Sequence, residues 1–163
     1  MKLIRGGKVV NASHTARYEV LIAGEKIAAL LDPNSDILDS IDNSNCEIID
    51  ASDKYVIPGG VDSHVHLQLP MSEQATSSDT FETGTQAAAW GGTTTVIDFA
   101  GQIKGTAVPE AIEARMAEAD GQCAIDYSFH LSVGDVHKQS LIDIRNTIEA
   151  GITSYKLFMA CLL

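Results

Sequence analysis

The stretch Pro58-Gly59-Gly60-Val61-Asp62-Ser63-His64-Val65-His66 decides the fold, because the pattern of the sequence changes there. Before it, residues 1–57 read as short apolar strands separated by glycine-containing and polar turns. No helix of useful length is expected in that segment, and residues 32–45 are expected to form a loop. After it, apolar strands alternate with helical segments. The change predicts two domains, a small all-β unit over 1–57 and an α/β unit over 58–163.

The α/β unit has a regular repeat of strands and helices. Successive strands begin about 30 residues apart, the length of a βα unit, and parallel strands with right-handed crossovers are therefore expected. A (β/α)₈ barrel and a doubly wound sheet both fit this repeat. No Gly-x-Gly-x-x-Gly follows any of the strands, which disfavours a dinucleotide-binding sheet. The strands are expected at 61–64, 93–99, 124–131 and 154–159, and the helices at 79–90, 108–120 and 138–150.

Asp62, His64 and His66 alternate at the carboxyl end of the first of these strands. Alternate residues of a strand share one face, so the three side chains are expected to point the same way. Two converging imidazoles can bind one divalent metal ion, and the carboxyl ends of barrel strands are where barrel active sites lie. A pair of histidines in a surface turn is the alternative. The context favours a metal site, and with it the barrel.

Lys156 is the second unusual residue, because it lies within the apolar segment Ser154–Met159. A lysine at the end of a strand can extend its amine to water. The alternative is a functional lysine with a nucleophilic amine. Such an amine can add carbon dioxide to form a carbamate, an anion able to bridge two metal ions.

Composition narrows the class of protein. Hydrophobic residues make up 45% and charged residues 20% of the chain, as in ordinary globular proteins. The net charge of −11 disfavours a nucleic-acid partner, because binding phosphates requires clustered lysine and arginine. No apolar run approaches the roughly 18 residues of a membrane span, and no signal peptide is expected. Three widely spaced cysteines fit a reducing compartment, so a cytoplasmic location is expected; they are Cys46, Cys123 and Cys161.

Three ordered motifs, residues 58–66, 91–99 and 151–160, resemble the cyclic amidohydrolases. Asp79-Thr80-Phe81 and Ala124-Ile125-Asp126-Tyr127 further resemble the dihydropyrimidinase and hydantoinase branch of that superfamily. The resemblance extends from the N-terminal strands through Ala160. It implies a metal-dependent (β/α)₈ TIM-like barrel with a β-sandwich built from both chain ends. Residues 1–57 would then be part of the sandwich, and residues 58–163 the first four βα units of the barrel.

The resemblance also implies a chemistry. His64 and His66 would bind the more buried of two zinc ions, and Lys156, carboxylated by carbon dioxide, would bridge both. The metal centre would activate water for attack on the ring amide of a dihydropyrimidine or a hydantoin, which yields an N-carbamoyl amino acid. The partner would be a small cyclic amide. A full-length protein of this family is expected to be a homo-oligomer, commonly a tetramer.

The chain departs from the family in two ways. Cys161 stands where these enzymes usually carry a tyrosine that binds the substrate, and a thiol is a short, weak hydrogen-bond donor. The family's other metal-binding histidines and its catalytic aspartate lie on later strands, so no catalytic residue is expected within this chain. Because a full barrel needs about 250 residues, the chain is expected to be an N-terminal portion that is inactive alone.

Two other functions stay open at this point. One is a non-catalytic homologue with a structural or assembly role, against which the intact metal residues weigh. The other is a different cyclic amidohydrolase, such as an allantoinase or a dihydroorotase. Two further residues draw attention: Asp98, which ends the second strand and is a candidate for supporting the metal site through hydrogen bonds, and His130, which either lines the mouth of the site or lies in the core or at the rim.

Overall fold

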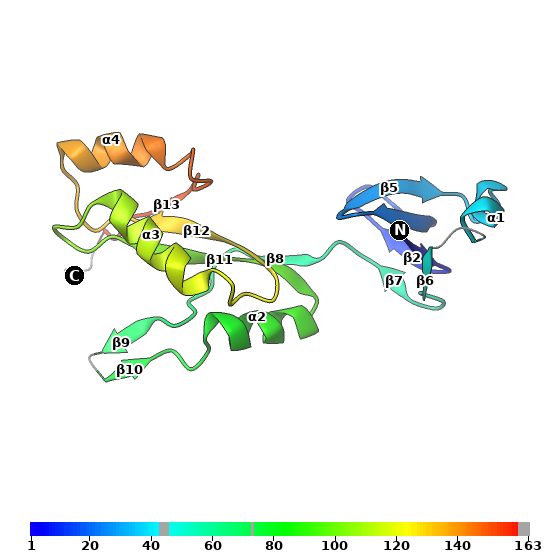
Figure 1. Cartoon of the computed structure of the whole chain (residues 1–163), viewed down its shortest axis with the longest axis horizontal. Coiled ribbons are helices and arrows are strands. Elements are labelled where there is room, and N and C mark those ends of the chain that lie inside the picture. The colour runs from blue at the N-terminus through cyan, green and yellow to red at the C-terminus, as the bar shows by residue number, and fades with distance from the viewer. Residues whose placement is uncertain (43–45, 73, 160–163) are drawn as a thin grey trace. The chain divides into compact units, whose positions relative to one another are not determined.

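The computed structural model describes residues 1–42, 46–72 and 74–159. The chain divides into two compact units, Met1–Pro58 and Gly59–Leu163. The first unit contains two small sheets (Figure 1). One has the strand order β5-β4-β1-β6 and the other β3-β2-β7. Their bounds are β1 Lys2–Arg5, β2 Lys8–Val10, β3 Thr15–Arg17, β4 Glu19–Ala23, β5 Lys26–Leu31, β6 Glu47–Asp50 and β7 Tyr55–Val56.

Helix α1 (Ile37–Asp42) lies where the sequence predicts a loop. Leu38 and Ile41 are three residues apart and therefore share one side of this helix. They are 3% and 9% exposed and pack in one cluster with the fully buried Leu3 of β1. The loop prediction is wrong because burial of this apolar pair stabilises a helical turn that the surrounding aspartates and serines do not favour.

The second unit contains a parallel sheet with the strand order β13-β12-β11-β8. The order in space follows the order along the chain. A doubly wound sheet reverses its order at a switch point, whereas a barrel adds its strands in sequence. The strand order therefore confirms the first half of a (β/α)₈ barrel. The strands are β8 Gly60–Asp62, β11 Thr93–Gly101, β12 Asp126–Ser132 and β13 Tyr155–Lys156.

The first two connecting helices begin and end close to their local signals, whereas the third, expected over 138–150, ends at Asn146. Helix α2 starts after Thr80, whose hydroxyl accepts a hydrogen bond from the N–H of Thr83, so the cap lies one residue beyond the expected Asp79. Pro109 lies in the first turn of α3, as expected. None of the helices in the described ranges is long and apolar enough to cross a bilayer. The remaining bounds are α2 Phe81–Trp90, α3 Val108–Ala119, α4 Lys138–Asn146, and a hairpin of β9 Pro70–Ser72 and β10 Ala75–Thr76.

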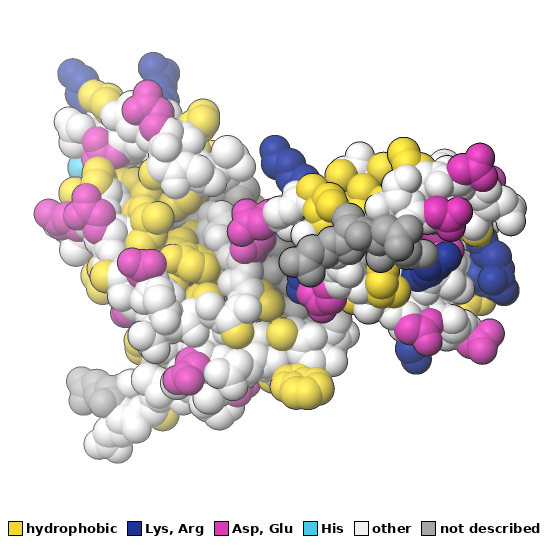
Figure 2. All heavy atoms as spheres, turned by 45° about the vertical axis from the view of Figure 1, so that its right-hand side comes forward, with side chains coloured by type: hydrophobic (Ala, Val, Ile, Leu, Met, Phe, Trp, Pro, Cys, Tyr) yellow, Lys and Arg dark blue, Asp and Glu magenta, His cyan; other side chains and the backbone are white. Residues whose placement is uncertain are grey.

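The two faces of the parallel sheet have different roles. Val96, Asp98 and Ala100 alternate along β11 and are buried, on the side covered by helix α3 (Figure 1). Phe99 points to the opposite face. On that face and at the sheet edges large apolar side chains stay exposed, among them Val61 and Leu157. Hydrophobic side chains are visible on the surface of both units (Figure 2).

Candidate metal centre

His64 and His66 follow directly after β8, which ends at Asp62. The expected strand reached His64, so it ends two residues early. The two imidazole rings nevertheless lie together, with centroids 5.2 Å apart and planes at 83°. Asp62 does not join them: its Oδ1 accepts a hydrogen bond from the backbone N–H of His64 at 3.2 Å.

The side chain of Phe99 is the centre of this site. Its ring centroid lies 4.7 Å from that of His64, 4.8 Å from that of His66 and 4.9 Å from that of His130. The Nζ atom of Lys156 lies 4.2 Å from the same centroid, a cation–π contact. We call these five residues the Phe99 cluster. It brings together the three predicted metal residues, His64, His66 and Lys156.

The register of the parallel strands explains this gathering. Phe99 of β11 pairs with His130 of β12, and Ser132 of β12 pairs with Lys156 of β13. Paired residues on neighbouring strands point to the same face of a sheet. The strands run in parallel, so their carboxyl ends meet at one edge. An open hollow of about 380 Å³ lies there, lined by His64, Phe99, His130, Tyr155, Lys156 and Leu157.

The electrostatics of His66 suit a metal ligand. Its Nδ1 atom is buried and has no hydrogen-bond partner. Burial, and after it the positive charge of Lys156, holds the pKa of His66 below the usual value for imidazole. A neutral imidazole is the form that binds zinc. Within residues 1–42, 46–72 and 74–159, no three His, Cys, Asp or Glu side chains are close enough to hold a metal ion.

This pKa can be measured directly. In the metal-free chain we expect the His66 ring to titrate below about 6.5, as followed by NMR of the ring signals. The variant Lys156→Met should raise the pKa of His66, because the neighbouring positive charge is removed. Lys138→Met is the matched control, since Lys138 does not contribute to the shift. A His66 pKa that Lys156→Met leaves in place would contradict the geometry of the Phe99 cluster.

Asp98 supports the site from behind the sheet. Its Oδ2 atom accepts hydrogen bonds from the backbone N–H of Leu67 and from Nη2 of Arg115, both at 2.9 Å. Arg115 also donates to the carbonyl oxygen of Leu67. The ion pair therefore holds both backbone groups of the residue that follows His66. Asp98 thus acts on the backbone rather than on an imidazole ring.

The sequence reading missed Arg115 and Phe99. Arg115 lies in a helix rich in alanine and glutamate and reads as a surface charge. A usable signal was Asp98, because a carboxylate in an apolar strand needs a buried partner. Phe99 reads as one more apolar strand residue. Cys161, the predicted substrate contact, lies outside the described residues.

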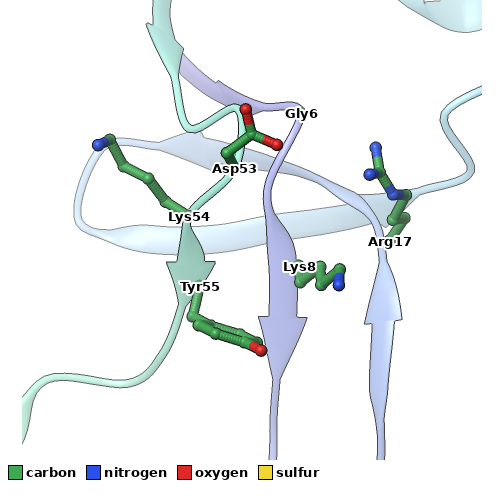
Figure 3. Close-up of a pocket in the computed structure, with 6 residues that line it drawn as sticks. All are labelled: Gly6, Lys8, Arg17, Asp53, Lys54 and Tyr55. Carbon is green, nitrogen blue, oxygen red and sulfur yellow. The ribbon is translucent and has the colours of Figure 1, made fainter.

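A second hollow, of about 150 Å³, lies in the first unit. Its lining contains three basic side chains, which would suit an anion if they converged. Figure 3 shows that Lys54 extends to the opposite side from Lys8 and Arg17. The charges do not meet at one point, so this hollow offers no built anion site. Its lining residues are Gly6, Lys8, Arg17, Asp53, Lys54 and Tyr55.

Comparison with known proteins agrees with this geometry. The model of the amidohydrolase family matches residues 55–160. The chain is 48% identical over 158 residues to a D-hydantoinase of Streptomyces coelicolor. The matched region covers 97% of this chain and 33% of that protein. It is 40% identical over 163 residues to a dihydropyrimidinase of Rattus norvegicus, with 97% and 30% covered.

A solved structure extends the likeness to three dimensions. The crystal structure of dihydropyrimidinase from Brevibacillus agri NCHU1002 matches 98% of this chain and 33% of that one, with a TM-score of 0.87 and 42% identity. The chain therefore spans about a third of the length of the relatives that it matches.

Proposed function

Because this chain belongs to the amidohydrolase family, we propose that the protein that carries it hydrolyses a cyclic amide. The ring of a dihydropyrimidine or a hydantoin would be opened to an N-carbamoyl amino acid. The relatives named D-hydantoinase and dihydropyrimidinase support this substrate class. The observation that carries the proposal is the Phe99 cluster, in which two imidazoles and a lysine meet at the carboxyl edge of a half-barrel.

Each residue of the site has a proposed role. His64 and His66 would hold zinc through their imidazoles, and the buried, unpartnered Nδ1 of His66 fits such a ligand. The neutral Lys156 amine would add carbon dioxide and release a proton, and the resulting carbamate would supply an anionic ligand to the zinc centre. The chemistry that zinc supplies when bound is a lowered pKa of water and polarisation of the ring carbonyl. Phe99 would orient the side chains by packing against all of them.

In the whole protein, both units of this chain would belong to larger domains. Residues 1–57 would belong to a β-sandwich domain and residues 58–163 would supply the first four βα units of the barrel. The further metal ligands and the catalytic aspartate would come from the part that the relatives have beyond this third. Cys161 would lie beside the substrate. We place such a protein in the cytoplasm as a homo-oligomer, a tetramer by its resemblance.

A chimera tests this function. Residues 1–158 would be joined to the remaining two thirds of the Streptomyces coelicolor D-hydantoinase. We expect zinc-dependent hydrolysis of hydantoin and dihydrouracil by the chimera and no turnover by the 163-residue chain alone, which lacks the later ligands. A chimera that folds like its parent, as judged by circular dichroism and size, but hydrolyses neither compound would favour the non-catalytic alternative.

A further inference from the structure

The ring of His130 is held by two hydrogen bonds, one at each nitrogen. Nε2 lies 2.8 Å from the carbonyl oxygen of Ser63, and Nδ1 is bonded to the hydroxyl of Ser154. A carbonyl oxygen can only accept, so Nε2 carries the hydrogen and donates it. In the neutral ring, Nδ1 then accepts from the Ser154 hydroxyl. Because both nitrogens are engaged, neither is free to bind a metal ion.

The two partners lie next to the predicted metal residues. Ser63 directly precedes His64, and Ser154 comes two residues before Lys156. Ser63 directly follows β8 and Ser154 directly precedes β13, and these are the two outer strands of the four-stranded sheet. Two other strands separate them, so no backbone pairing joins one segment to the other. The His130 ring spans that gap.

We propose that His130 is a positioning residue that sets the separation between His64 and Lys156. This rests on the proposed metal centre. The ring of Phe99 packs against the His130 ring, with the two ring centroids 4.9 Å apart. Without the two hydrogen bonds, the segments that carry His64 and Lys156 lose this direct link and are joined through the intervening strands β11 and β12. The spacing of the two ligands would then be held less firmly, and the metal affinity would fall.

The hydrogen-bond pattern is tested first, on the metal-free 163-residue chain. At a pH where the ring is neutral, the nitrogen-15 shifts of His130 should place its proton on Nε2. Ser154→Ala should change the shift of Nδ1, because its donor is lost, whereas Ser154→Thr keeps a hydroxyl and should restore it. A proton on Nδ1 in the unaltered chain would overturn the proposal.

The positioning role is tested on the metal-free chimera with the Streptomyces hydantoinase, which supplies the remaining ligands, by titrating it with cobalt chloride and following the absorption of bound Co²⁺. We expect His130→Phe to weaken the affinity about tenfold, the lower range for loss of a group that orients metal ligands. The phenyl ring can still pack on Phe99, so the free energy of unfolding measured in urea should change much less than the metal affinity. His14→Phe, the same substitution in the first unit, should leave the affinity unchanged. Should His130→Phe fail to fold, the two Ser154 variants provide the comparison.

The outcomes separate this role from the proposed function. Cobalt binding by the chimera that is weakened in His64→Asn but unchanged in His130→Phe overturns the positioning role and leaves the metal centre in place. No cobalt binding by the unaltered chimera, or an affinity that His64→Asn leaves unchanged, overturns the metal centre and this role with it. A weakened affinity that Ser154→Ala shares and Ser154→Thr restores supports the proposal.

Discussion

Arg115→Met is expected to destabilise the second unit by about 3–5 kcal/mol, the usual cost of removing one partner of a buried ion pair. Asp98 is 1% exposed and would keep an uncompensated charge. The carbonyl oxygen of Leu67 would also lose the hydrogen bond that Arg115 donates. Urea unfolding followed by circular dichroism measures the loss. Arg145→Met, on the exposed last turn of α4, should stay within about 0.5 kcal/mol of the unaltered chain.

The double variant Asp98→Leu with Arg115→Met distinguishes a simple ion pair from a backbone clamp. If the pair acted only through its charges, removing both should recover nearly all of the stability. Because the pair also satisfies the N–H and the carbonyl of Leu67, the double variant should remain destabilised by about 1–3 kcal/mol. Full recovery would show that the bonds to Leu67 contribute little.

Loss of Lys156 should have the largest effect on activity. In the chimera with the Streptomyces hydantoinase, we expect Lys156→Arg to lower kcat/KM by more than the 10- to 100-fold cost of an outer partner. Arginine keeps a cation that can lie over Phe99, but its guanidinium is not a nucleophile that adds carbon dioxide. The substitution therefore separates the carbamate from the cation–π contact seen at 4.2 Å.

Mass spectrometry of the intact chimera provides the second measurement. The unaltered protein should carry the added mass of one carbon dioxide at Lys156, which acid should remove, and Lys156→Arg should not carry it. Lys104→Arg, at an exposed turn before α3, is the matched control for activity and mass. Near-normal turnover by Lys156→Arg would contradict the proposed carbamate.

Much of the fold could be predicted because its signals are local. The cap of α2, the glycines after it and the β-branched run of β11 each act over a few residues, and these elements follow them. Helix α4 is shorter than expected and ends at Asn146. The hairpin of β9 and β10 and helix α1 were not predicted, because their sequences carry no strong local preference. Tertiary contacts decide such segments, as the burial of Leu38 and Ile41 against Leu3 shows for α1.

The amino-acid sequence by itself determined the residue types of the site, the spacing of His64 and His66, and the β-α alternation that favours a barrel. Only the tertiary structure decided how they meet. Phe99 becomes their common contact, His130 joins two outer strands, and Arg115 balances Asp98 behind the sheet. These relations depend on strand order and register, which bring residues far apart in the chain to one edge. The local sequence pattern does not specify which residues from distant parts of the chain will lie side by side.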